Sequence, residues 1–271
     1  MEPQDITGET PPEFLYHYTS QEGLIGIITR RCIWASKIHY MNDSEEFSMA
    51  LRLAKAELKK RSETEKEGYL RFRLKDFCYQ IRQIKDINVC VCSFSAKDDS
   101  LSQWRAYSRE GAGYAIGFKT KKLSKVAANS HFSLHKCVYA PIDQQTEINR
   151  LIEDFLAMPK DDSVLLKFWE PMAMLAPLIK DNSFEDEKEW RLISRPPISF
   201  SGLDHRPSRS MIAPYFRLLI GTDQEFDCLH EVVVGPTPNP ELSKESVHSL
   251  LESQGLRNIA VRATKVPYRN W

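Results

Sequence analysis

Four places in the sequence carry polar side chains that could bind a ligand or carry charge in a reaction. His17 and Thr19 lie two residues apart in the apolar segment "FLYHYTS", so on a strand both would point to the same side. Ser93 and Ser95 share that spacing in "NVCVCSFS". Imidazole and hydroxyl groups bond polar ligands, so both pairs are candidates for a binding site. The alternative for His17 is a core histidine with one satisfied partner.

The other two places hold aromatic rings and carboxylates. Trp104 and Tyr107 lie three residues apart in "SLSQWRAY", on one face of a short helix, where they would either stack on a flat ring or pin the helix to a sheet. Glu187 and Glu189, in "FEDEKEWRLI", lie at the start of an apolar strand. A glutamate there can bind a hydroxyl group or stabilise a cation, and the alternative is an exposed acidic turn. A fifth stretch, "YMNDSEEF", resembles a helix N-cap, but Tyr40 and Asn42 could still face a pocket.

Composition limits the class of protein. The 271 residues are 42% hydrophobic, which suffices for a buried core in one large domain. Lys and Arg together number 37, as do Asp and Glu, so no bulk charge directs the chain to nucleic acid or membranes. No apolar run is long enough to span a bilayer, and the six scattered cysteines favour reduced thiols in a cytoplasmic protein without a metal site. We expect a flexible lead-in over residues 1–13 and a single domain over residues 14–271.

Local patterns predict the elements that position these residues. Thr19 and Glu22 have capping-box spacing, which predicts that a helix starts there, and Asn42 or Asp43 would cap a long helix from about Glu45. The expected strands are "FLYHY", "CIWAS", "NVCVCSFS", "GYAIGF", "FSLHKCVYA", "EWRLI", "PYFRLLI", "EVVVG" and "NIAVRAT". Helical insertions are expected near residues 45–87, with Phe72 among the apolar positions at helical spacing, and near 146–180. Strands and helices mix irregularly, which predicts an α+β fold.

The order of these motifs resembles a known family. The segments "LYHYTSQEGLIGII", "IWASKIHYMNDSEEF", "LSQWRAY", "EKEWRLI", "EVVVGP" and "VPYR" are similar, over most of the chain, to a widespread bacterial family of unknown function. More distantly, they resemble the His–Tyr–Glu branch of the ADP-ribosyltransferase superfamily. That resemblance implies a split β-sandwich of two small mixed or antiparallel sheets around a cleft for NAD, which is the substrate.

The resemblance also implies roles for individual residues. His17 and Thr19 would contact the ribose and the nicotinamide amide, beside Tyr16 on the same strand. Ser93 and Ser95 match the second motif, while Tyr107, Trp104 or Tyr40 would stack on nicotinamide. Glu189 would be the catalytic acid, with Glu187 as its alternative and His17 as the second catalytic residue. This implies that His17, Ser93, Tyr107 and Glu189 line one cleft.

The chemistry suits these residue types. Nicotinamide leaves NAD through a state in which positive charge develops on the ribose, so a nearby carboxylate stabilises that state more than the ground state. The implied activity is ADP-ribosyl transfer or NAD hydrolysis, with a protein, a nucleic acid or water as acceptor, no metal and no membrane partner. The alternatives are a catalytically silent module that binds a nucleotide or a protein, and a metal-independent RNA-processing enzyme using His17, His39 and Glu189.

Overall fold

The computed structural model describes residues 9–41, 44–84, 87–107, 113–157, 169–195, 199–208, 210–222 and 225–267. Its strands are β1 (Phe14–Ser20), β2 (Cys32–Lys37), β3 (Cys90–Ser95), β4 (Gly113–Lys119), β5 (Phe132–Lys136), β6 (Glu189–Ser194), β7 (Asp204–Pro207), β8 (Ile212–Leu219), β9 (Leu229–Val234) and β10 (Ala260–Ala263). Its α-helices are α1 (Gln21–Arg30), α2 (Ser44–Thr64), α3 (Gly68–Ile84), α4 (Leu101–Tyr107), α5 (Thr120–Ala128), α6 (Pro141–Ala157), α8 (Trp169–Leu175) and α9 (Pro240–Ser253). Short 3-10 turns are η1 (Ile38–Tyr40), η3 (Ala176–Leu178), η4 (Asn182–Glu187) and η5 (Phe200–Gly202).

The described strands form one large sheet. Its order is β10-β9-β4-β1-β3-β2-β8-β7, with β6 added to β3 and β5 added to β6. The β9–β10 pair is parallel and the other strand pairs are antiparallel. The α+β class is therefore confirmed, but the strands make one mixed sheet, and two separate small sheets around a cleft are not shown.

The sheet branches at β3. Along one edge β3 pairs with β6 from Val91 to Ser95. The other edge is shared, because β1 pairs with β3 at Ser95 while β2 pairs with it at Val91 and Cys90. The strands β1 and β2 thus separate from each other along the middle of β3.

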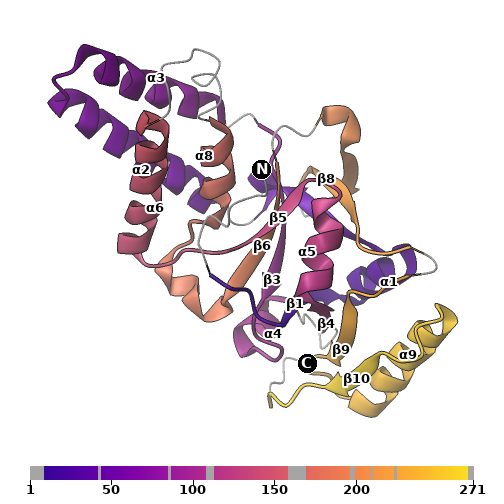
Figure 1. Ribbon diagram of the computed structural model, residues 1–271. Coiled ribbons are helices and arrows are strands. Elements are labelled where there is room, and N and C mark those ends of the chain that lie inside the picture. The colour runs from indigo at the N-terminus through magenta and orange to yellow at the C-terminus, as the bar shows by residue number, and fades with distance from the viewer. Residues whose placement is uncertain are drawn as a thin grey trace.

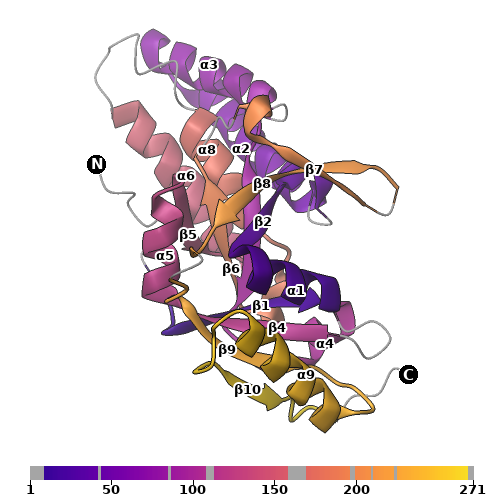
Figure 2. The same cartoon turned by 90° about the vertical axis from the view of Figure 1, so that its right-hand side faces the viewer.

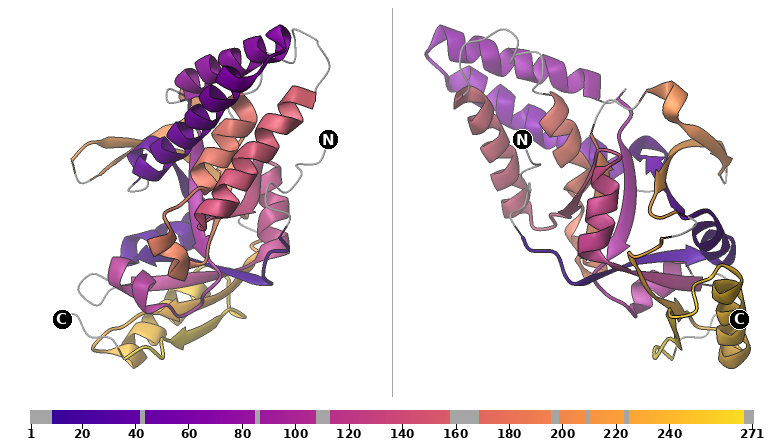
Figure 3. Two further views of the ribbon diagram at one scale, coloured as in Figure 1. Left: turned by 90° about the vertical axis from the view of Figure 1, so that its left-hand side faces the viewer. Right: turned by 45° about the vertical axis from the view of Figure 1, so that its right-hand side comes forward.

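The helices pack against the sheet in two groups. Apolar residues of α1, α5 and α9 join those of β1, β3, β4, β6 and β9 in one core. A second core joins α2, α3, α6 and α8 to Val91 and Ile193 of the sheet. These four helices gather at one end of the molecule, whereas α9 and β10 lie at the opposite end (Figures 1, 2 and 3). None of the helices in the described ranges is both long enough and apolar enough to cross a bilayer.

Several expected boundaries shift by a residue or more. Strand β1 continues to Ser20, which pairs with Gly113, so Ser20 and not Thr19 caps α1, accepting a hydrogen bond from the Gly23 amide. Asn42 and Asp43 lie outside the described residues, as do 158–168 within the second helical insertion. Phe72 faces solvent with 60% of its surface exposed, because the buried face of α3 lies on the other side of the helix.

A buried arginine ties α3 to the end of α6. Arg73 is 1% exposed, and its guanidinium donates hydrogen bonds to the carbonyls of Leu156, at 3.3 Å, and Phe155. These carbonyls belong to the last turn of α6, where backbone acceptors have no helical partner and a cation is favourable.

We expect Arg73→Met to lower the free energy of unfolding by about 2–3 kcal/mol, because the buried carbonyls would lose charged donors. Urea denaturation of the variant measures this. Arg82→Met is the matched control, because Arg82 is exposed on the same helix, and its change should stay within about 0.5 kcal/mol. Equal effects of the two substitutions would contradict this role for Arg73.

Candidate functional site

Glu189 is a buried carboxylate held by two cations. It is 5% exposed at the start of β6. Its Oε1 accepts from Arg191 Nε at 2.8 Å and its Oε2 from Lys180 Nζ at 2.6 Å. Arg191 stands two residues further along the strand, so alternation places both side chains on one face.

Lys180 reaches the Glu189 carboxylate because the backbone around Lys180 runs beside the segment that follows β5. Ile179 forms a parallel bridge with Val138, and the Lys180 amide donates to the Val138 carbonyl. The ammonium group also bonds Glu187 Oε2 at 2.5 Å. Lys180, Glu187, Glu189 and Arg191, here called the Glu189 cluster, thus contain two cations and two carboxylates.

The cluster keeps Glu189 ionised. Burial by itself would raise the pKa of this carboxyl group, but the charges of Arg191 and Lys180 and their hydrogen bonds outweigh burial and lower the pKa to about 2. At neutral pH Glu189 therefore has no proton to give, and its chemical capacity is to stabilise positive charge. Each of its oxygens already faces a cation.

This pKa predicts how stability varies with pH. The ordinary pKa of 4.5 applies to the unfolded chain and about 2 to the folded one, so at intermediate pH only the unfolded chain binds the proton. The ionised Glu189 carboxylate contributes fully to the free energy of unfolding above pH 4.5. This contribution, roughly 3 kcal/mol, is lost as the pH falls towards 2. Urea unfolding measured at falling pH should show this loss, and Glu189→Gln should show a shallower slope wherever both proteins are folded. An equal pH dependence of stability in the two proteins would contradict the lowered pKa of Glu189 in the folded chain.

The two serines lie beside this cluster. The register of β3 and β6 puts Ser95 opposite Glu189 and Ser93 opposite Arg191. Ser95 Oγ donates to the Glu187 carbonyl at 2.7 Å and accepts from the Lys97 amide. Ser93 Oγ is buried and has no hydrogen-bond partner among the described residues, so its hydrogen-bonding capacity is unused there.

His17 does not share the face of Glu189. Tyr16 pairs with Ser95, which pairs with Glu189, so the next residue of β1 points to the other side of the sheet. There the His17 ring lies 5.7 Å from that of Phe94. The expectation that His17 and Glu189 line one cleft is therefore corrected by the strand register.

The His17 ring bridges the branch point of the sheet. Its Nδ1 lies 2.9 Å from the Ser93 carbonyl oxygen, so the proton of the neutral ring belongs on Nδ1. Burial lowers the pKa of His17, although the bond to Ser93 opposes this. The neutral ring thus joins β1 to β3 where β1 and β2 separate.

Two of the four aromatic candidates, Trp104 and Tyr16, have structural partners. Trp104 is fully buried, donates to Asp99 and packs edge-on against Tyr18 at 4.7 Å. The hydroxyl of Tyr16 donates to Glu231 at 2.9 Å. Thr19, which lies on the same strand as Tyr16 and was expected to contact NAD, is buried, with 9% of its surface exposed.

The two remaining aromatic candidates are accessible. Tyr107, at the end of α4, is 45% exposed, and Tyr40, in η1, is 39% exposed. Of the three rings expected to stack on nicotinamide, these two present a surface to solvent, whereas Trp104 does not.

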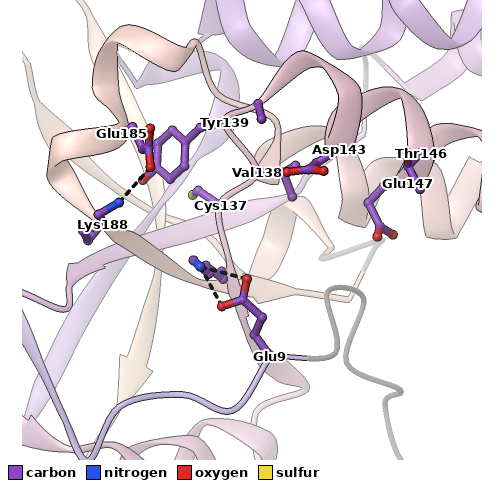
Figure 4. Close-up of a pocket in the computed structure, with 11 residues that line it drawn as sticks. Glu9, Cys137, Val138, Tyr139, Asp143, Thr146, Glu147, Glu185 and Lys188 are labelled. Atoms are coloured by element: carbon purple, nitrogen blue, oxygen red, sulfur yellow. Dashed lines mark hydrogen bonds and ion pairs between the residues drawn. The ribbon is translucent and has the colours of Figure 1, made fainter.

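A polar hollow adjoins the Glu189 cluster. It holds about 400 Å³ and is lined by residues including Glu9, Lys136, Tyr139, Glu185 and Lys188 (Figure 4). Tyr139 connects it to the cluster, because its hydroxyl accepts a hydrogen bond from the Glu189 amide at 2.8 Å. This volume falls in the range of small-molecule sites. Among the described residues, no group of three or more His, Cys, Asp and Glu side chains is arranged to hold a metal ion.

Three residues of this site were not predicted from the sequence. Arg191 was detectable, since its spacing from Glu189 on a strand pairs opposite charges on one face. Lys180, in the apolar run "MLAPLIKD", carried a weaker signal, because a lysine in such a run needs a buried counter-charge. Tyr139 gave no signal, since its bond to Glu189 arises from the chain fold alone.

Comparison with known proteins gives a family match for part of the chain. Residues 103–192 match the family described as "Protein of unknown function (DUF2971)", so the expectation of a domain of unknown function is confirmed for this segment. The segment contains the whole Glu189 cluster and both aromatic candidates of α4. No curated protein matches the chain. The match names no activity and gives no link to ADP-ribosyltransferases.

Proposed function

We propose that this protein cleaves the bond between nicotinamide and ribose in NAD and passes ADP-ribose to an acceptor or to water. The observation that carries the proposal is the ionised Glu189 carboxylate at the start of a strand, directly opposite Ser95 on the neighbouring strand. The resemblance to ADP-ribosyltransferases assigns the second motif to the strand with Ser93 and Ser95 and the third motif to Glu189 at the start of a later strand. The separation of β1 from β2 along β3 is compatible with a split sandwich.

In this proposal Glu189 stabilises the positive charge that develops on the ribose as nicotinamide leaves. A carboxylate fixed in a buried site needs little reorganisation to do so. Before it can do so, the Glu189 carboxylate must lose its contact with one of its two cations and contact the substrate instead. Lys180 is the cation that can leave, because it already bonds Glu187 and would keep that partner.

The neighbouring groups would position the substrate. The unpartnered Ser93 hydroxyl can bond a ribose or amide oxygen on the same face as Glu189. Tyr40 or Tyr107 would offer a ring to nicotinamide. We assign His17 a positioning role, since its bond to the Ser93 carbonyl holds the strand that carries this hydroxyl.

Incubation of the purified protein with NAD tests the proposal, with released nicotinamide measured by chromatography. The assay is run in buffer for hydrolysis, and with cell extract and labelled NAD for transfer to a macromolecule. We expect nicotinamide release in at least one of these conditions. Absence of both free nicotinamide and labelled product would contradict the proposal.

A second candidate is a module that binds NAD or a related nucleotide without turnover. The observation that favours it is the pairing of both Glu189 oxygens with buried cations, which neutralises the charge that catalysis needs. Calorimetry distinguishes the two candidates. Binding of NAD without nicotinamide release would support the silent module.

A further inference from the structure

Helix α3 carries a solvent-facing stripe of alternating cations and aromatic rings. At about 100° per residue, five positions fall within an arc of about 100° on the helix surface. They are Arg71, Phe72, Lys75, Tyr79 and Arg82, and all five are exposed. We call them the α3 stripe. The opposite side of α3, with Leu74, Phe77 and Ile81, is fully buried.

The rings of the α3 stripe are among the most exposed large apolar side chains of the described residues. Phe72 is 60% exposed and Tyr79 is 59% exposed. Helix α3 lies at the outer end of the molecule, away from β9 and β10 (Figures 1 and 2). Packing against α2 and α8 uses the buried side of α3, so the stability of the fold gives no reason for the two rings.

The charge of the α3 stripe is entirely positive. Lys75 and Arg82 have no ion-pair partner among the described residues, and Arg71 donates to the backbone carbonyl of Glu65. The one acidic residue of α3, Asp76, stands beside the stripe and accepts from Gln80. This excess is local, because the whole chain has a formal net charge of zero.

We propose that the α3 stripe binds single-stranded nucleic acid. Cations interleaved with exposed rings are the combination that such strands require, since the cations meet phosphates and the rings stack on bases. From Arg71 to Arg82 the stripe extends for about 16 Å, and its two rings stand about 10 Å apart along the helix. Unpaired bases are required, because a duplex hides the faces on which rings stack.

An anionic membrane surface fits the α3 stripe less well. Helices that lie in a membrane interface insert a continuous apolar face into the lipid. The continuous apolar face of α3 is already buried in the protein core, and the exposed side offers two rings separated by cations.

Fluorescence anisotropy with the full-length protein and a labelled 20-nucleotide oligo(dT) or oligo(U) tests this inference. NAD is left out, so the result does not depend on the proposed activity. We expect Phe72→Ala/Tyr79→Ala to weaken binding at least tenfold, because the variant lacks two stacking surfaces. Lys75→Glu/Arg82→Glu should also weaken binding. It should reduce the slope of log K against log salt by about 1.4, or 0.7 for each phosphate that is no longer neutralised.

The matched control is Lys59→Glu/Lys60→Glu, which makes the same change in net charge at exposed positions of α2. It should retain the stacking contribution and bind more tightly than either α3 variant. Melting temperatures should stay near that of the wild type, because all substituted side chains are exposed. No oligonucleotide binding at low salt, equal binding by wild type and α3 variants, or binding to anionic vesicles alone would overturn the inference.

Discussion

Replacing Glu189 by glutamine is expected to lower the free energy of unfolding by about 3–5 kcal/mol, the usual cost of removing one partner of a buried ion pair. The substitution keeps the shape of the side chain but leaves Arg191 and Lys180 with one carboxylate, Glu187, in place of two. Arg191 is 1% exposed, so water cannot replace the missing charge. Urea denaturation at pH 7 measures the effect.

Glu187→Gln is the matched control for this prediction. Glu187 bonds the same ammonium group, but its side chain is 25% exposed, and Lys180 would keep Glu189. The free energy of unfolding should fall by about 1 kcal/mol or less. Should both variants unfold at the same urea concentration as the wild type, the Glu189 cluster would not support the fold as the geometry indicates.

The second large effect concerns turnover. If Glu189 stabilises the developing positive charge, Glu189→Gln should slow nicotinamide release roughly a hundredfold to a thousandfold, equivalent to about 2.7–4 kcal/mol in the barrier. The assay must be run at saturating NAD, well below the melting temperature of the variant, because this substitution also weakens the fold. Circular dichroism at the assay temperature confirms that the variant is folded.

Two further variants separate chemistry from stability in this assay. Arg73→Met weakens the fold at the contact between α3 and α6, outside the Glu189 cluster, and should leave the rate per folded molecule near that of the wild type. Ser93→Ala removes a hydroxyl with no described partner, so it should raise KM for NAD with little change in melting temperature. A normal rate for Glu189→Gln would exclude this carboxylate from the chemistry and leave Glu187 as the next candidate.

Periodicity explains why most elements of the fold could be predicted from the sequence. The short runs "NVCVCSFS" and "EWRLI" were expected as strands, and they form β3 and β6. The break between α2 and α3 follows from the polar residues at 62–68. The strand β7 was missed, because "DHRP" lacks the apolar alternation that predicts a strand.

The candidate site was less predictable, because it depends on pairing between distant strands. The sequence places Glu189 and Ser95 on strands, but only the register shows that they face each other. That same register moves His17 to the other side of the sheet. Lys180 is positioned at the site by the parallel backbone bridge between its neighbour Ile179 and Val138. No local sequence pattern predicts such a bridge.

The most direct measurement of the central proposal is a crystal structure of the protein with a non-hydrolysable NAD analogue. We predict that the ribose next to nicotinamide lies against the Glu189 carboxylate, on the face that carries Ser93 and Ser95, with Lys180 turned towards Glu187. An analogue bound on the face of His17, or remote from Glu189 with the Lys180–Glu189 ion pair intact, would contradict it.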